Sequence, residues 1–142
     1  MDKKTAKKRV LVIPCSGIGK VHGLLSREAT YLVVDELAPE DTDTLCLALL
    51  VKGDPAALEE VRTHECVAID GCGKACAQKN VEMAGGIVGK AIEVASALRN
   101  YRGVQPGTGS VLTEDGWEIA RDLATMVASE VAGLRDGKEG DG

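Results

Sequence analysis

Apolar residues along this chain alternate between short continuous runs and longer stretches with helical spacing. The run 9–14 is rich in β-branched residues and stops at Pro14, which is typical of a buried strand. A turn of small residues follows at 15–19, and apolar positions then recur at helical spacing from about residue 20 until the pattern closes before Pro39. The chain is therefore predicted to begin with a strand and a helix.

The middle of the chain repeats this alternation. Leu45–Val51 is apolar and predicted to be extended, although such a short run also fits a helix. Asp54 and Pro55 supply an N-cap and a first-turn proline for a helix that ends near His64. The apolar run 66–70 then predicts another strand.

The second half of the chain is less regular. A helix is expected to end near Met83, the stretch 87–98 fits either a strand or a helix, and 99–109 is a loop rich in glycine and proline. Asp115 and Glu118 predict the cap of a last helix. Its apolar stripe consists of Ile119, Leu123, Met126, Val127, Val131 and Leu134.

Alternating strands and helices favour an α/β fold of three layers, with a mainly parallel sheet covered by helices on both faces, as in Rossmann-like and flavodoxin-like proteins. The length of 142 residues and the hydrophobic content of 44% suit one domain. We expect this domain at 9–134, a basic disordered tail at 1–8 and a charged disordered tail at 135–142. Ligands in such sheets bind at the carboxyl ends of the strands.

Charge and cysteine content limit the possible functions. The net charge is −5, and five of the 17 lysines and arginines lie in the first nine positions as a terminal stretch, so nucleic-acid binding is not expected. The apolar run before Pro14 is too short for a secretory signal, and no segment is long enough to span a membrane, which predicts a cytoplasmic protein. Five cysteines in such a protein are expected to be reduced thiols that serve metal or redox chemistry.

Cys72 and Cys76 carry the strongest chemical signal. If the helix after the strand 66–70 begins just past Gly73, both sulfurs lie on one helical face at its N-terminus, where thiolates are stabilised. Cys15 follows the first strand, so its sulfur is expected at the same sheet edge. Together with Cys46 these thiols would suit a tetrahedral zinc ion. Cys46 fits a ligand and a buried core residue equally well, whereas Cys66 is expected in the core.

The loop after the first strand excludes two anion-binding motifs. Pro14 and Val21 stand where a Walker loop needs glycine and a hydroxyl residue, and Val21 also stands where a phosphatase loop needs arginine. A sulfur-transfer loop remains possible, in which one cysteine forms a persulfide and Lys20 replaces the usual arginine.

The chain resembles the DGC-domain family over nearly its whole length after the basic tail. The residues that carry this resemblance are Ile13-Pro14-Cys15-Ser16-Gly17, the middle cysteine Cys46, and Ile69-Asp70-Gly71-Cys72 followed by Cys76. The family is described as putative zinc-binding proteins with four shared cysteines. The resemblance implies Cys15, Cys46, Cys72 and Cys76 as the metal ligands, leaves Cys66 outside them, and brings no established reaction.

Several neighbouring residues are expected to support this site. Asp70 is predicted to cap the following helix in preference to acting as a ligand or base. Gly71 and Gly73 would permit a tight turn around the sulfurs, and backbone N–H groups of the loop formed by Ser16, Gly17 and Gly19 would offset negative charge. His22 is a better candidate ligand than His64, although both are interpreted first as surface or satisfied residues.

Three function classes follow from these residues. The first is a zinc-binding protein in which the metal is structural, stored or handed to a protein partner. The second is a thiol enzyme of redox or persulfide chemistry that uses Cys72 and Cys76, or Cys15. The third is an iron–sulfur cluster protein, because such clusters also accept four thiolates. The oligomeric state does not follow from the sequence.

Overall fold

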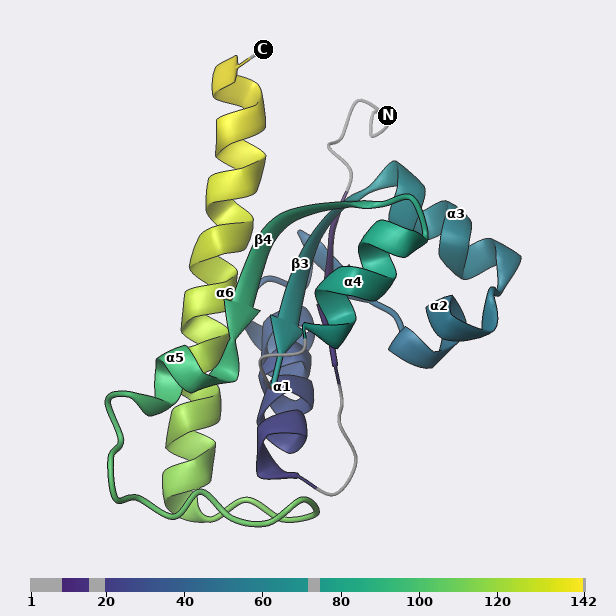
Figure 1. The fold of residues 1–142 in the computed structure, drawn as a ribbon. Coiled ribbons are helices and arrows are strands. Elements are labelled where there is room, and N and C mark those ends of the chain that lie inside the picture. The colour runs from purple at the N-terminus through teal and green to yellow at the C-terminus, as the bar shows by residue number, and fades with distance from the viewer. Residues whose placement is uncertain (1–8, 16–19, 72–74, 142) are drawn as a thin grey trace.

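The computed structural model describes residues 9–15, 20–71 and 75–141, with side chains as far as residue 135 (Figure 1). Its elements in chain order are β1 (Val10–Pro14), α1 (Val21–Leu32), the π-helical turn η1 (Val33–Leu37), β2 (Thr42–Thr44), α2 (Leu47–Lys52), α3 (Pro55–Thr63), β3 (Glu65–Asp70), α4 (Cys76–Met83), β4 (Ile87–Glu93), α5 (Val94–Leu98) and α6 (Glu114–Asp141).

The described strands form one parallel sheet in the order β2-β1-β3-β4. The chain moves from β1 outward to β2, then crosses back to β3 on the opposite side of β1. The sheet order therefore reverses between β1 and β3, and the crevice at their carboxyl ends is where parallel sheets of this type bind ligands. The predicted α/β fold with a parallel sheet is confirmed, and the strand order, which the sequence did not predict, is of the flavodoxin-like type.

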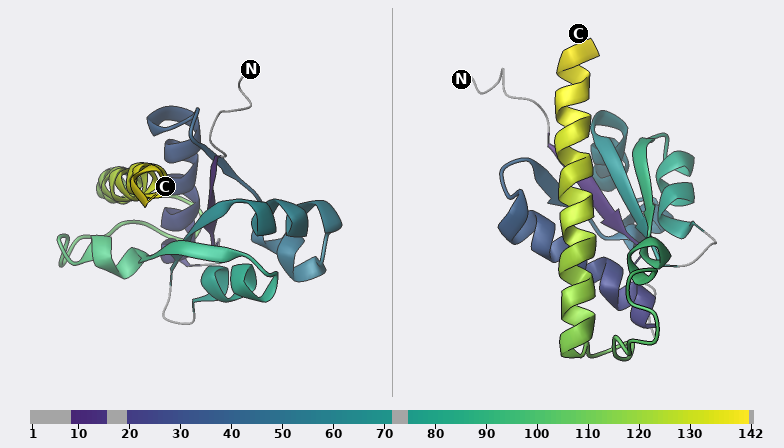
Figure 2. Two further views of the ribbon diagram at one scale, coloured as in Figure 1. Left: turned by 90° about the horizontal axis from the view of Figure 1, so that it is seen from above. Right: turned by 90° about the vertical axis from the view of Figure 1, so that its left-hand side faces the viewer.

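Helices cover both faces of the sheet (Figure 2). On β1, Val10 and Val12 face the core formed with α1, α5 and α6, whereas Leu11 and Ile13 face the core formed with α2, α3 and α4. All five residues of β1 are buried. A strand buried on both faces needs apolar residues at consecutive positions, which is why β1 and β3 are continuous apolar runs in the sequence.

The apolar stretch 45–51 was expected to be extended, and that prediction is wrong. The strand β2 ends at Thr44, and α2 begins at Leu47 with Cys46 as its N-cap residue. Gly53 ends α2 in a left-handed conformation, with φ 85°. A short apolar run has no period that separates a strand from a helix, so the composition of 45–51 could not decide between them.

The stretch 87–98 contains both a strand and a helix, the two expected alternatives, because β4 runs directly into α5.

The last helix is capped by Thr113 and not by Asp115, since the Thr113 hydroxyl accepts the N–H of Gly116 at 3.0 Å. It continues to Asp141, whereas a disordered tail was expected from residue 135. The expected basic tail at 1–8 lies outside the described residues. None of the described helices is long and apolar enough to cross a bilayer.

Cys66 is fully buried in β3, as expected for a core residue. Burial, and secondarily the charge of Glu65, raises the pKa of its thiol from 9.0 to about 12. In the unfolded chain this thiol ionises near its ordinary pKa, but in the folded chain it stays protonated to higher pH. The raised pKa therefore contributes fully to the free energy of unfolding below about pH 9, and this contribution is lost as the pH rises toward 12.

We predict that Cys66→Ala flattens this alkaline loss of stability. Urea unfolding midpoints of both proteins, measured in reducing buffer from pH 8 upward, should fall less steeply in the variant. Tyr101, whose pKa is also raised to about 12 because it donates a hydrogen bond to Asp122, is present in both and cancels in the comparison. Equal slopes for the two proteins would contradict the prediction.

Candidate functional site

The candidate site begins where β1 and β3 end beside each other. The backbone N–H of Cys15 donates to the carbonyl of Ile69 at 2.9 Å, which extends the sheet by one residue. The N–H of Gly71 in turn donates to the Cys15 sulfur at 3.1 Å. The Cys15 sulfur therefore accepts a hydrogen bond from the backbone of the Asp-Gly-Cys segment. This bond ties the first cysteine to that segment, 56 residues further along the chain.

Ser26 is a second polar neighbour of the Cys15 sulfur. This buried serine on α1 donates its hydroxyl to the carbonyl of Gly23 at 2.8 Å, and its oxygen lies 3.7 Å from the sulfur. Ser26 was not among the residues expected at the site. The available signal was a hydroxyl residue on the apolar face of a predicted helix, where a polar group needs a partner.

Gly71 is required by a close approach between two segments. A Cβ placed on it would lie 3.0 Å from the Cβ of His22 and 3.1 to 3.2 Å from the carbonyl atoms of the same residue. These atoms belong to the first turn of α1 and cannot move aside independently. The Asp-Gly-Cys segment therefore packs directly against the start of α1, and any side chain at position 71 would push them apart.

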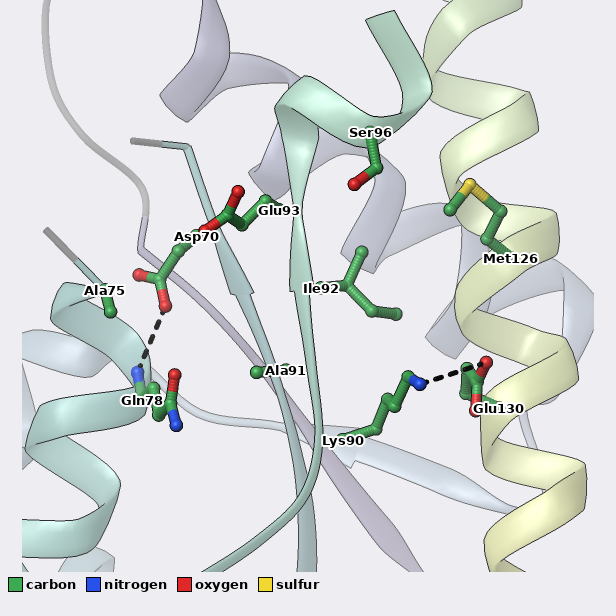
Figure 3. Close-up of a pocket in the computed structure, with 10 residues that line it drawn as sticks. All are labelled: Asp70, Ala75, Gln78, Lys90, Ala91, Ile92, Glu93, Ser96, Met126 and Glu130. Carbon is green, nitrogen blue, oxygen red and sulfur yellow. Dashed lines mark hydrogen bonds and ion pairs between the residues drawn. The ribbon is translucent and has the colours of Figure 1, made fainter. Parts of the chain in front are cut away.

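Asp70 caps α4 from a distance, which confirms its predicted role. Its carboxylate is only 3% exposed and accepts the N–H of Ala77 at 2.7 Å and that of Gln78 at 3.2 Å (Figure 3). Ala75, the residue before the helix, has φ 55° and ψ 46° and no capping side chain of its own. Asp70 thus satisfies two backbone donors that the helix start would otherwise leave without a partner.

The helix after β3 was expected to begin just past Gly73, whereas α4 begins at Cys76, after Ala75 in a left-handed conformation. The expectation that Cys72 and Cys76 share one helical face stays a prediction, because Cys72 lies outside the described residues. Cys76 is exposed at the helix start. Cys72 and Gly73 lie outside the described residues, as do Ser16, Gly17 and Gly19, so their roles stay predictions.

Cys46 is exposed at the N-terminus of α2, which excludes the alternative of a core residue. It lines, together with Cys15, a cleft of about 690 Å³. The structure thus brings two of the four predicted ligands to one cleft. His64 is held at the end of α3, where its Nδ1 lies 2.7 Å from the carbonyl oxygen of Glu60, as expected for a residue without a site role.

A second cavity, of about 410 Å³, lies beside β4 on the other side of Asp70 (Figure 3). Its wall includes Lys90, whose ammonium group lies 3.9 Å from a carboxylate oxygen of Glu130. None of the four described cysteines lines it. Cys15 and Cys46 therefore belong to the cleft between α1 and α2 and not to this cavity.

The described donors do not complete a metal site by themselves. Within residues 9–15, 20–71 and 75–141, no three His, Cys, Asp or Glu side chains are placed to hold a metal ion. The set of four cysteines includes Cys72, so it depends on a residue outside these ranges. The donor chemistry fits zinc, because thiolates are its preferred ligands and an N–H group already donates to the Cys15 sulfur.

Comparison with known proteins gives one match. Residues 11–116, well over half of the chain, match the family model described as the DGC domain. The matched range includes all five cysteines and ends in the first turn of α6. No curated protein and no solved structure matches the chain.

We predict that Asp70→Ala destabilises the fold by about 1–3 kcal/mol, because it leaves two backbone N–H groups at a buried helix start without an acceptor. The comparison variant is Asp54→Ala. Asp54 is the N-cap residue directly before α3, and its carboxylate accepts a single N–H, from Ala57. Urea unfolding should show the larger loss for Asp70→Ala. An equal or smaller loss would contradict a capping role for Asp70.

We also predict that Gly71→Ala destabilises the protein by about 1–3 kcal/mol, since the new methyl group meets the backbone of His22. Gly133→Ala is the matched control, because a Cβ at this position in α6 meets no atom within 4 Å. That control should be neutral or slightly stabilising. If thermal unfolding shows the same midpoint for both variants, the close approach at Gly71 is not a constraint.

Proposed function

This chain belongs to the DGC-domain family, and we propose that it is a zinc-binding protein whose metal is held by the thiolates of Cys15, Cys46, Cys72 and Cys76. The observation that carries the proposal is the hydrogen bond from the Gly71 N–H to the Cys15 sulfur. Such bonds orient metal-binding thiolates and spread their negative charge. The bond also places the residue before Cys72 directly beside Cys15, so a chelate between the two loops requires no large rearrangement.

Zinc suits this donor set better than other common metals. It accepts four thiolates in a tetrahedral arrangement and imposes no geometry of its own. Four thiolates around one divalent ion leave a net negative site, which backbone N–H groups partly compensate. Glycine at position 71 lets this segment pack against His22 at the start of α1 while its N–H donates to the Cys15 sulfur.

The exposure of two ligands favours a storage or relay role over a purely structural one. Cys46 and Cys76 are both exposed, whereas Cys15 is half-buried. An incoming thiol from a partner protein would reach Cys46 or Cys76 first, and stepwise ligand exchange would then pass the metal on. The partner is therefore expected to present cysteine thiolates of its own.

A metal-free thiol function is the second candidate, and one observation favours it. The Cys15 sulfur is flanked by the Gly71 N–H and the Ser26 hydroxyl, an environment that also suits a nucleophilic thiolate or a bound persulfide. Cys46, which lines the same cleft, would then supply the thiol for a second step.

The experiment is elemental analysis of protein purified without oxygen, with an absorption spectrum of the same sample. We expect about one zinc per chain and no visible colour. Cys15→Ser, Cys46→Ser, Cys72→Ser and Cys76→Ser should each lower the zinc content strongly, because each removes one ligand. Cys66→Ser is the matched control and should retain the metal, since Cys66 is buried in the core.

Three other results would contradict zinc binding at this site. Equal loss of metal in Cys66→Ser would show that the ligand set is wrong. A brown protein that contains iron would favour a cluster. A colourless, metal-free protein with one rapidly alkylated cysteine would favour the thiol function.

A further inference from the structure

The cleft that contains Cys15 and Cys46 exists because β2 is shorter than β1. Only Val10, Leu11 and Val12 of β1 have a partner in β2, so the last two residues of β1 have no neighbouring strand on that side. The chain turns away after Thr44 into α2, which packs on the opposite face of the sheet from α1. The gap between α1 and α2 at the sheet edge is the cleft of about 690 Å³.

Pro14 leaves the edge of β1 that faces the cleft without a backbone N–H at this position. The N–H of Cys15 points toward β3, where it donates to Ile69, so the backbone nitrogen of Pro14 points toward the free side. A proline there has no N–H that would need a partner. The cleft can therefore stay open at position 14 without leaving a backbone N–H that lacks a hydrogen-bond partner.

The lining of the cleft is largely apolar. Leu45, Leu47 and Val51 line it from the α2 side, and Tyr31 lines it from α1. Tyr31 is 45% exposed and Val51 is 67% exposed, although both are large hydrophobic residues. A concave, mostly apolar surface of this volume falls in the usual range for small-molecule sites.

Arg27 adds a single cation to this apolar lining. It stands one helical turn before Tyr31 on α1, so both side chains lie on the same face of the helix and line the cleft. Its side chain is half-buried, and among the described residues no ion pair or hydrogen bond engages its guanidinium group. No carboxylate lines the cleft in the described part of the chain. A partly desolvated guanidinium without an anion favours an anionic ligand.

We propose that this cleft binds a small organic anion with an apolar body, such as a medium-chain carboxylate. The anionic head group pairs with Arg27, and the apolar body lies against Tyr31, Leu47 and Val51. The ligand then covers Cys15 and Cys46 and shields their sulfurs from solvent. The proposal goes beyond zinc binding and holds with or without a bound metal, because Arg27 and the apolar wall supply the affinity.

The test is an NMR titration of the full chain with three probes. Octanoate carries both features, 1-octanol carries only the apolar body, and acetate carries only the anion; octanoate is kept below micelle-forming concentrations. We expect octanoate to bind more tightly than either of the others. Backbone amide shifts should be largest at 27–31 and 44–51, the segments that line the cleft.

Arg27→Met should weaken octanoate binding about tenfold and leave 1-octanol binding unchanged, because only the charge-assisted contact is lost. Arg102→Met is the matched control, since Arg102 is an exposed arginine in the loop after α5 and should have no effect. The zinc content of the unmodified protein and of both variants, measured on the same samples, should be equal. A loss of zinc would therefore be distinguished from a loss of octanoate binding.

Four outcomes would overturn the proposal. The first is that octanoate and 1-octanol bind with the same affinity at the same site. The second is that Arg102→Met weakens octanoate binding as much as Arg27→Met does, and the third is that the largest shifts lie outside the cleft. A fourth is that the protein is a dimer which Val51→Asp dissociates, because a second copy of the chain would then cover the cleft.

Discussion

The hydrogen bond from the Gly71 N–H to the Cys15 sulfur joins the two strand ends between which the sheet order reverses. It forms because β1 and β3 are adjacent and parallel, with Cys15 one residue and Gly71 two residues after the last pair of their ladder, Pro14 and Ile69. It also needs position 71 to lack a side chain, since the start of α1 packs against it. Asp70 then fixes the start of α4. The Asp-Gly pair thus positions backbone groups, and the cysteines supply the chemistry.

Most of the fold could be predicted from the sequence because β1 and β3 are buried on both faces and must be continuous apolar runs. The secondary structure of 45–51 could not be predicted, because it depends on where β2 ends and stops pairing with β1. For the site, the capping role of Asp70 and the burial of Cys66 followed from residue type and position. The contact between Ser26 and Cys15 depends on how α1 packs against the strand ends, which no local pattern encodes.

The four cysteines that the structure describes differ in their environments. Cys66 is buried with a raised pKa and is chemically quiet, whereas Cys46 and Cys76 are exposed at helix starts. Cys15 lies between these extremes, half-buried and held by two polar neighbours. In the proposed zinc site, Cys15 would be the firmly held ligand, and Cys46 and Cys76 would be the ligands open to exchange.

The most direct test of zinc binding by thiolates is the X-ray absorption spectrum at the zinc edge of the protein purified without oxygen. Four sulfur atoms at about 2.3 Å from the metal are expected, because every predicted ligand is a cysteine. A spectrum dominated by nitrogen or oxygen neighbours at about 2.0–2.1 Å would contradict thiolate ligation and with it the proposed function.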